Sequence, residues 1–272
     1  MTAPPDPYDA PMHSRLIDAL ALAVREAGEL VERIRLAGFV SRDKADASPV
    51  TEADEQAEIL LTAAIAAADP GALIVGEEAC AAGVRPDPTA RFWLIDPVDG
   101  TKDFIAGGPD YSVNVALIDG GVPMLGLVLA PRSGMLWAGA IGVGAFRQAA
   151  DGAREPIATR AMPTAPVVVT SRSHLDDQTR AYCAAIPNAQ TRPSGSSLKF
   201  CLLAEGSADV YPRFGPTSEW DTAAGDAVLR AAGGTTRHPD GRDFSYGKAE
   251  FLNGAFLAVG EPDSIGRLPP LS

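Results

Sequence analysis

Cysteine is scarce in this sequence. The chain of 272 residues has three, Cys80, Cys183 and Cys201, and no CxxC motif. A small, odd number of widely separated cysteines argues against a disulfide framework and favours a reducing compartment. We therefore expect a cytoplasmic protein, and peripheral attachment to the cytoplasmic face of the inner membrane is left open.

Histidine and positive charge are also in short supply. The three histidines, His13, His174 and His238, lie in separate segments without the spacing of a zinc site. Lysine and arginine number 23 against 35 acidic residues, so the formal net charge is −12. That balance argues against binding a nucleic-acid polymer, which requires a basic face. It does not exclude a small phosphorylated ligand, because local charges can oppose the overall field.

Long hydrophobic runs are missing as well. None reaches the length that spans a membrane, and the opening stretch MTAPPDPYDAPMHSR lacks the charged and apolar regions of a signal peptide. We expect neither a transmembrane segment nor a secretion signal. The hydrophobic share of 46% is that of a globular chain, and 272 residues suffice for a sizeable core.

The first part of the chain predicts two helices followed by short strands. An amphipathic helix is expected from Ser14, its N-cap, to a stop at Gly38. A second helix is expected after the cap Thr51, with Asp54 in its first turn, and the DPG at 69–71 ends it. Between 72 and 141, β-rich runs broken by Gly and Pro predict a meander of strands.

From about residue 155 onward, segments of strand and helix character alternate, as in α/β proteins. We therefore predict two halves: an α+β half over 1–153, with a helix pair, an antiparallel sheet and most candidate metal ligands, and an α/β half over 154–272. The second half would recognise the substrate and supply the last ligand.

Acidic residues end or begin several of these segments. They are Asp54, Glu77, Glu78, Asp96, Asp99 and Asp221. Each ionised carboxylate at the end of a buried strand costs several kcal/mol unless something compensates its charge. One alternative is that the acids are ordinary turn and cap residues, and it predicts no response to Mg²⁺ or to a chelator.

Divalent metal is the other interpretation. Oxygen ligands without His or Cys suit Mg²⁺ rather than zinc. Asp96 and Asp99, around a proline, can point at one place, and Asp96 has two oxygens with which to bridge two ions that act on a phosphoryl group. Gly100 allows a ligand to approach the backbone closely, and a helix beginning at Thr101 would point N–H groups at an anion. The Thr101 hydroxyl near Asp54 could act as a general base toward water.

Three motifs carry a resemblance to a known family. They are GEE at 76–78, WLIDPVDGTKDF at 93–104 and WDTAAGDAVL at 220–229. Together they resemble the inositol monophosphatase superfamily of Mg²⁺-dependent, lithium-sensitive phosphatases. SPVTEAD, TSRSH, GSSLKFCLLAEGSADVYPRFGPTSEWDTAAG and FLNGAF are similar to its 3'(2'),5'-bisphosphate nucleotidases of the CysQ type. The likeness runs from about 15 to 259 and implies a layered αβαβα sandwich, with the metal cluster between the halves.

The resemblance also implies roles for individual residues. Glu77, Asp96 and the Val98 carbonyl would hold a first Mg²⁺, and Asp96, Asp99 and Asp221 a second; a third, weaker ion near Glu77 is left open. Thr101 with Asp54 would activate the attacking water, with Glu77 beside them. The scissile phosphate would contact the backbone at Gly100 and Thr101, and Asp99 and Asp221 would also lie against the substrate.

Nucleotide recognition would fall to His174, Ser196, Lys199 and Arg213. Cationic side chains are the expected partners of a phosphate dianion. Simpler roles remain open: Lys199 as a solvated helix charge, Arg213 as a partner of Glu219, and His174 as a helix cap. The family usually has His where this chain has Asp226, from which we expect a change in local packing or pKa and not a loss of catalysis.

The predicted function is therefore Mg²⁺-dependent removal of the 3'-phosphate of adenosine 3',5'-bisphosphate, giving AMP. Its sulfated relative PAPS is left open as a second substrate. One alternative is an inositol monophosphatase or another sugar phosphatase of the same superfamily. Another is a regulatory binding protein on this scaffold. The predicted partner is a small phosphorylated nucleotide, and both monomer and homodimer remain open.

Overall fold

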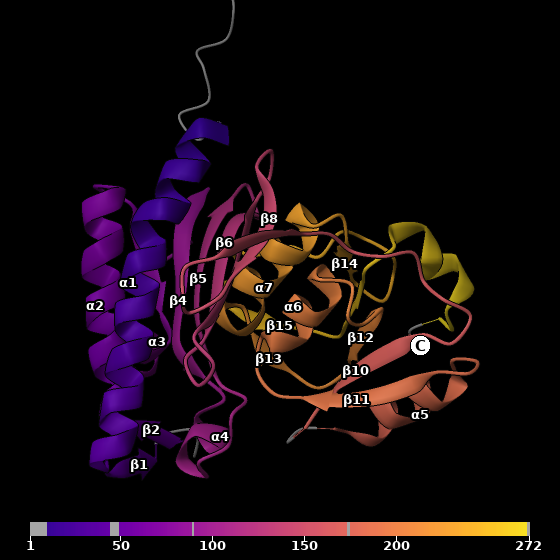
Figure 1. Cartoon of the computed structure of the whole chain (residues 1–272), viewed down its shortest axis with the longest axis horizontal. Coiled ribbons are helices and arrows are strands. Elements are labelled where there is room, and N and C mark those ends of the chain that lie inside the picture. The colour runs from indigo at the N-terminus through magenta and orange to yellow at the C-terminus, as the bar shows by residue number, and fades with distance from the viewer. Residues whose placement is uncertain (1–9, 44–48, 89, 173–174, 271–272) are drawn as a thin grey trace, which may run out of the picture.

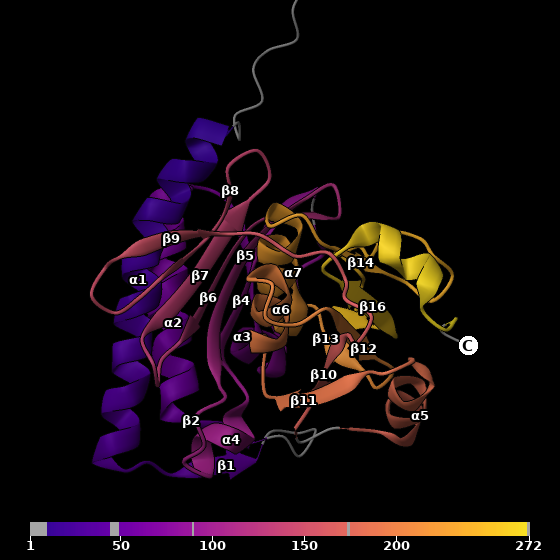
Figure 2. The ribbon, with the colours of Figure 1, turned by 45° about the vertical axis from the view of Figure 1, so that its right-hand side comes forward.

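The chain folds into alternating layers of helix and sheet. The computed structural model describes residues 10–43, 49–88, 90–172 and 175–270. Two long N-terminal helices cover one face of a seven-stranded sheet, two helices fill the middle, and a five-stranded sheet with further helices completes the far side (Figure 1, Figure 2). This is the expected layered αβαβα sandwich, so the predicted fold class is confirmed.

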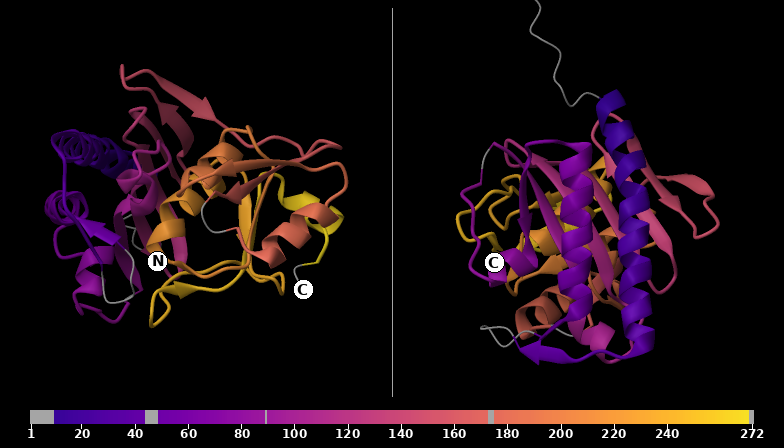
Figure 3. Two further views of the ribbon diagram at one scale, coloured as in Figure 1. Left: turned by 90° about the horizontal axis from the view of Figure 1, so that it is seen from below. Right: turned by 90° about the vertical axis from the view of Figure 1, so that its left-hand side faces the viewer.

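The outer layer consists of α1 (Ala10–Ala37) and α2 (Glu52–Ala68), which lie side by side in Figure 3. Thr51 caps α2 as predicted: its side chain accepts from the N–H of Ala53, and its backbone N–H donates to Asp54. The hairpin of β1 (Ser41–Asp43) and β2 (Pro49–Thr51) leads into that cap. No helix among the described residues has both the length and the apolar content required to cross a bilayer.

The seven-stranded sheet contains the expected meander. Along β4 (Arg91–Asp99), Trp93 and Ile95 pack toward α1 and α2, whereas Phe92 and Leu94 belong to the core on the other face. Both faces are buried, which explains the unbroken apolar run FWLI. The other strands, in sheet order around β4, are β3 (Leu73–Gly76), β5 (Ser112–Asp119), β6 (Val122–Ala130), β7 (Met135–Ala140), β8 (Gly144–Gln148) and β9 (Arg154–Ile157).

The middle layer holds α6 (Leu198–Ala204) and α7 (Trp220–Ala231). A Cβ added at Gly126 of β6 would lie 2.2 Å from the Ala224 carbonyl oxygen of α7. Glycine at that position therefore lets α7 pack directly against the sheet. Two short helices, α3 (Glu77–Ala81) and α4 (Thr101–Ile105), begin where β3 and β4 end.

The five-stranded sheet is mixed and lies between the middle layer and the outer helices α5 (Asp177–Ala185) and η1, a 3-10 helix (Pro262–Arg267). A separate pair, β13 (Thr217–Ser218) and β15 (Leu252–Asn253), lies beside the start of α7. The strands of the five-stranded sheet, in sheet order, are β11 (Gln190–Ser194), β10 (Val167–Ser171), β12 (Val210–Arg213), β16 (Phe256–Val259) and β14 (Thr235–Arg237).

Some details of the structure differ from the sequence-based expectation. Ser14 is not an N-cap, because α1 already runs at Ala10; Pro11 fits there, since first-turn N–H groups have no partner within the helix. The sequence analysis missed β9 and β11, which are proline-containing edge strands with largely exposed side chains. The division at residue 153 stays a prediction, and the first sheet continues past it to Ile157.

Candidate active site

A bulge at the end of β4 places the first two acids. The pairing of β4 with β5 shifts register between Asp96 and Asp99, where Pro97 has no N–H to offer. The Val98 N–H, released from the ladder, donates to the Asp96 carboxylate at 3.1 Å. Asp96 is 1% exposed and Asp99 lines the same cavity. The irregularity therefore directs both carboxylates into the interior.

Gly100 makes the turn that follows. Its φ is +93°, and a Cβ there would lie 2.9 Å from the Asp110 carbonyl oxygen. Any other residue would combine a left-handed backbone with a steric conflict. The next residue, Thr101, begins α4, so the predicted helix start is confirmed.

Thr101 and Asp54 lie in contact although 47 residues separate them. The Thr101 hydroxyl lies 3.2 Å from Asp54 Oδ1 and 3.0 Å from the Val98 carbonyl oxygen, and its one proton can serve either acceptor. The other Asp54 oxygen accepts from the backbone and hydroxyl of Thr51 at 2.9 and 2.6 Å. The capping box of α2 thus fixes the carboxylate that faces Thr101.

A buried glutamate that the sequence analysis missed supports Glu77. Glu58 of α2 accepts the backbone N–H groups of Glu78 and Ala79, each at 2.8 Å, and so caps α3, the helix that Glu77 begins. A Cβ at Gly76 would lie 2.3 Å from the Glu58 carboxyl carbon. The available signal was the spacing: Glu58 follows Asp54 by one helical turn, on the same face of α2.

A second missed network surrounds Asp221, at the start of α7. Asp221 accepts the Ser218 N–H at 2.9 Å. The fully buried Glu219 beside it accepts from Lys248 Nζ at 2.9 Å and from the backbone N–H groups of Gly247 and Lys248 at 2.7 and 3.0 Å. The considered pairing of Glu219 with Arg213 is therefore wrong: Lys248 takes that place.

Asp99 links the end of β4 to the segment that precedes α6. Its Oδ2 accepts the Ser196 hydroxyl at 2.7 Å and the Ser197 N–H at 2.6 Å. Ser197 also donates its hydroxyl to the Asp221 carbonyl at 2.6 Å. Ser196, a predicted nucleotide contact, adopts φ +55° and spends its hydroxyl on Asp99 and Ser112. A substrate would have to share that hydroxyl with a carboxylate.

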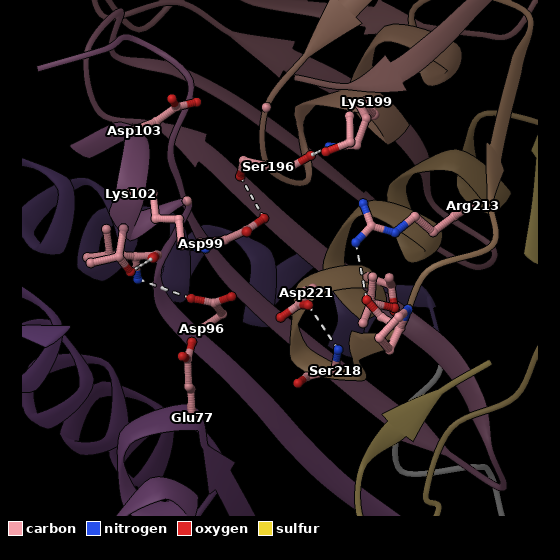
Figure 4. Close-up of a pocket in the computed structure, with 18 of the residues that line it drawn as sticks. Glu77, Asp96, Asp99, Lys102, Asp103, Ser196, Lys199, Arg213, Ser218 and Asp221 are labelled. Carbon is pink, nitrogen blue, oxygen red and sulfur yellow. Dashed lines mark hydrogen bonds between the residues drawn. The ribbon is translucent and has the colours of Figure 1, made fainter. Parts of the chain in front are cut away.

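These side chains surround one cavity of about 600 Å³ with walls of opposite charge (Figure 4). Glu77, Asp96, Asp99 and Asp221 form the acidic wall, and Lys199 and Arg213 line the cavity from α6 and β12. Val98, Gly100, Thr101 and Ser196 also line it. Asp54 reaches it through Thr101, and His174 lies outside the described residues.

The cavity perturbs the protonation of its side chains. Burial raises the pKa of Asp96 well above its usual range, and the neighbouring charges of Glu77, Asp99 and Asp221 raise it further. Asp221 behaves in the same way: burial acts first, then Asp99 and Glu77. Across the cavity, burial lowers the pKa of Lys199 to about 8, while Asp99 opposes the shift. Lys199 is 4% exposed, so it is not a solvated helix charge.

The chemistry of the acidic wall fits a hard divalent cation, since every candidate donor is an oxygen. Burial and then the mutual repulsion of the carboxylates raise the pKa values of Asp96 and Asp221, and a bound cation would relieve that repulsion. Within the described ranges, however, no three His, Cys, Asp or Glu side chains stand close enough to form a finished metal site.

The fold and cavity define a class of protein: a layered αβαβα chain with an acid-lined cavity to which β4 of the seven-stranded sheet and β12 of the five-stranded sheet both contribute. A family model described as the inositol monophosphatase family matches residues 12–262. The chain belongs to that family, which confirms the resemblance read from its motifs.

Three relatives within or similar to this family show how much of the chain is matched. The chain is 41% identical to the 3'(2'),5'-bisphosphate nucleotidase CysQ of Escherichia coli K12 over 246 residues, 89% of this chain and 98% of the relative. Its identity to the Salmonella typhimurium protein of the same name is 44% over 215 residues, 78% of this chain and 86% of the relative. A crystal structure of CysQ from Bacteroides thetaiotaomicron superposes with a TM-score of 0.76 at 32% identity, covering 94% of this chain and 99% of that one.

Proposed function

We propose that this protein is a Mg²⁺-dependent 3'(2'),5'-bisphosphate nucleotidase that hydrolyses adenosine 3',5'-bisphosphate to AMP and phosphate. The observation that carries the proposal is the single cavity with an acidic wall facing Lys199 and Arg213. A nucleotide with two phosphates can present one to each side. The names of the relatives at 41% and 44% identity support the same substrate, and the three buried free cysteines support a cytoplasmic location.

The groups that would hold Mg²⁺ are Glu77, Asp96, the Val98 carbonyl, Asp99 and Asp221. The proposal includes two ions and a third, more weakly bound ion near Glu77. When bound, such ions supply a low-pKa water and neutralise charge on the attacking and leaving oxygens. Of the protein's own groups, Thr101 would orient the water and relay its proton: the Thr101 oxygen would take the proton that the water loses, while the hydroxyl proton of Thr101 passes to Asp54 Oδ1, 3.2 Å away.

Lys199 and Arg213 would hold the phosphate that is not cleaved. A guanidinium offers five N–H donors in a planar fork, and two of them already meet the carbonyl oxygens of Gly215 and Pro216, which fixes the orientation of Arg213. Lys199 Nζ donates to the Ser196 carbonyl and lies 5.2 Å from the centroid of the Tyr211 ring. Both cations are therefore fixed before a ligand arrives, which lowers the entropic cost of binding it.

The substrate proposal is tested by steady-state kinetics of the whole enzyme with Mg²⁺. We expect kcat/KM for adenosine 3',5'-bisphosphate to exceed that for inositol 1-phosphate and fructose 1,6-bisphosphate by about tenfold or more, the worth of one good charged contact. Lys199→Met should reduce this preference and leave turnover of adenosine 3'-monophosphate, which lacks the second phosphate, unchanged. A preference for either sugar phosphate would instead assign the enzyme to the sugar phosphatases.

Metal dependence has a readout that needs no turnover. Because the folded-state pKa values of Asp96 and Asp221 are raised, the metal-free protein gains stability from these groups below about pH 4, the usual range of an unfolded carboxyl, and loses it as pH rises through the raised values. A cation at about 100 times its Kd restores about 2.7 kcal/mol. We expect Mg²⁺ to raise the melting temperature above that in chelator, by more at pH 7.5 than at pH 5.

Potassium chloride at equal ionic strength is the control for this melting experiment. If Mg²⁺ and chelator gave the same melting temperature at both pH values, the acids would be the turn and cap residues of the alternative interpretation.

A further inference from the structure

Arg213 is the last residue of β12, and the loop that follows it accepts hydrogen bonds from its guanidinium. Helix α5 packs against this loop. Arg213 Nε donates to the Gly215 carbonyl at 3.2 Å and Nη2 to the Pro216 carbonyl at 3.1 Å. The position of the guanidinium in the cavity therefore depends on where residues 214–216 lie.

Asp176, the N-cap of α5, is the polar anchor of that loop. Its two carboxylate oxygens accept from the N–H and the hydroxyl of Thr179, each at 2.7 Å. The Gly215 backbone lies against the same carboxylate: a Cβ at Gly215 would lie 3.5 Å from Asp176 Oδ2, and the Gly215 N–H helps to lower the pKa of Asp176. One side chain thus caps a helix and fixes the residue whose carbonyl oxygen orients Arg213.

Two further observations indicate that the contact between Asp176 and the 214–216 loop is stable. Partial burial alone would raise the pKa of Asp176, but the hydrogen bonds from Thr179 and Gly215 outweigh it and leave that pKa below its ordinary value. Beside it, the ring of Tyr182 on α5 packs against Phe214, with 5.6 Å between the ring centroids. Tyr182 is itself held by a hydrogen bond from its hydroxyl to the Pro269 carbonyl at 2.9 Å.

We propose that Asp176 is a positioning residue for substrate specificity. By fixing Gly215, it holds the Arg213 guanidinium at the place in the cavity where the second phosphate of the substrate binds. The inference rests on the proposed function in that it assigns Arg213 to this phosphate. Asp176 itself touches no substrate. Its loss lets the 214–216 loop move, so the cost appears in binding of the second phosphate and not in the chemical step at the acidic wall.

The test separates loop anchoring from helix capping. Asp176→Ser keeps a good N-cap for α5, but its shorter side chain leaves Gly215 without a partner. We expect KM for adenosine 3',5'-bisphosphate to rise about tenfold, the worth of one charge-assisted contact, with kcat unchanged. KM for adenosine 3'-monophosphate should not move. Asp177→Ser is the matched control, because this neighbouring acid on the same helix is fully exposed and its ion pair with Arg180 is long, at 3.8 Å.

A double-mutant cycle and a binding measurement complete the test. In an Arg213→Ala background, Asp176→Ser should raise KM no further, because both changes remove one interaction. Calorimetric titration with AMP, which carries only the 5'-phosphate, should show about tenfold weaker binding for Asp176→Ser. The affinity of Asp177→Ser for AMP should equal that of the wild type. Equal KM increases for both substrates, additivity with Arg213→Ala or unchanged AMP affinity would each overturn the inference. Wild-type enzyme that does not hydrolyse the bisphosphate would refute the proposed function, while the AMP titration would still decide the role of Asp176.

Discussion

Replacing Asp96 by Asn is expected to lower kcat/KM by on the order of 10³-fold, the scale seen when one group that stabilises transition-state charge is removed. Asp96 is buried at the centre of the acidic wall, and its pKa is raised by burial and by Glu77, Asp99 and Asp221. An amide keeps the shape and removes the charge. Because that charge is repelled by its neighbours, the variant should melt at the same or a higher temperature than wild type in chelator, and its gain from Mg²⁺ should shrink.

Asp103→Asn is the matched control for Asp96→Asn. Asp103 lines the same cavity but is not among the candidate ligands, so its amide should retain both activity and the response to Mg²⁺. Near-normal turnover by a folded Asp96→Asn protein would contradict the assignment of Asp96 to the metals. If Asp96→Asn abolished turnover but the variant still rescued a strain lacking the protein, a regulatory binding protein would become the better interpretation.

Asp226→Ala is expected to reduce the free energy of unfolding by about 3–5 kcal/mol, the cost of removing one partner from a buried ion pair. Asp226 is fully buried in α7, and its carboxylate accepts from Arg230 at 3.0 Å, from the Thr236 hydroxyl at 2.7 Å and from the Tyr246 hydroxyl at 3.0 Å. The alanine leaves a mostly buried guanidinium and two hydroxyls without this acceptor. Urea denaturation measures the loss directly.

Two further variants make the Asp226 prediction specific. Asp243→Ala removes an exposed acid paired with Arg237 and should change stability little, as exposed ion pairs usually contribute under about 1 kcal/mol. Arg230→Met in the Asp226→Ala background should recover much of the loss, because it removes the stranded charge. If the double variant were as unstable as Asp226→Ala, the ion pair would not be the cause. Substrate turnover should survive in all folded variants, since none of these residues lines the cavity.

Much of the fold could be predicted because its central elements carry strong local patterns. The capping box at Thr51 and Asp54, the glycine stop at Gly38 and the apolar run of β4 each act over a few residues, and the structure contains all three. The edge strands β9 and β11 escaped prediction, because a strand with one paired side tolerates proline and exposed polar residues. Their identity as strands depends on their neighbours.

The acidic side of the cavity could be recognised in the sequence. Glu77, Asp96, Asp99 and Asp221, which line the cavity, could be named because acids at the ends of apolar segments require compensation of their charge. Lys199 and Arg213 were named only from the resemblance to the family. The hydrogen-bonding partners of the cavity acids and of the neighbouring acids could not be read from the sequence. Glu58 caps the helix of Glu77, Lys248 rather than Arg213 pairs with Glu219, and Asp226 meets Arg230. These partners are brought together by packing of distant segments, and a hydrogen bond between such segments leaves no periodic or local signal in the chain.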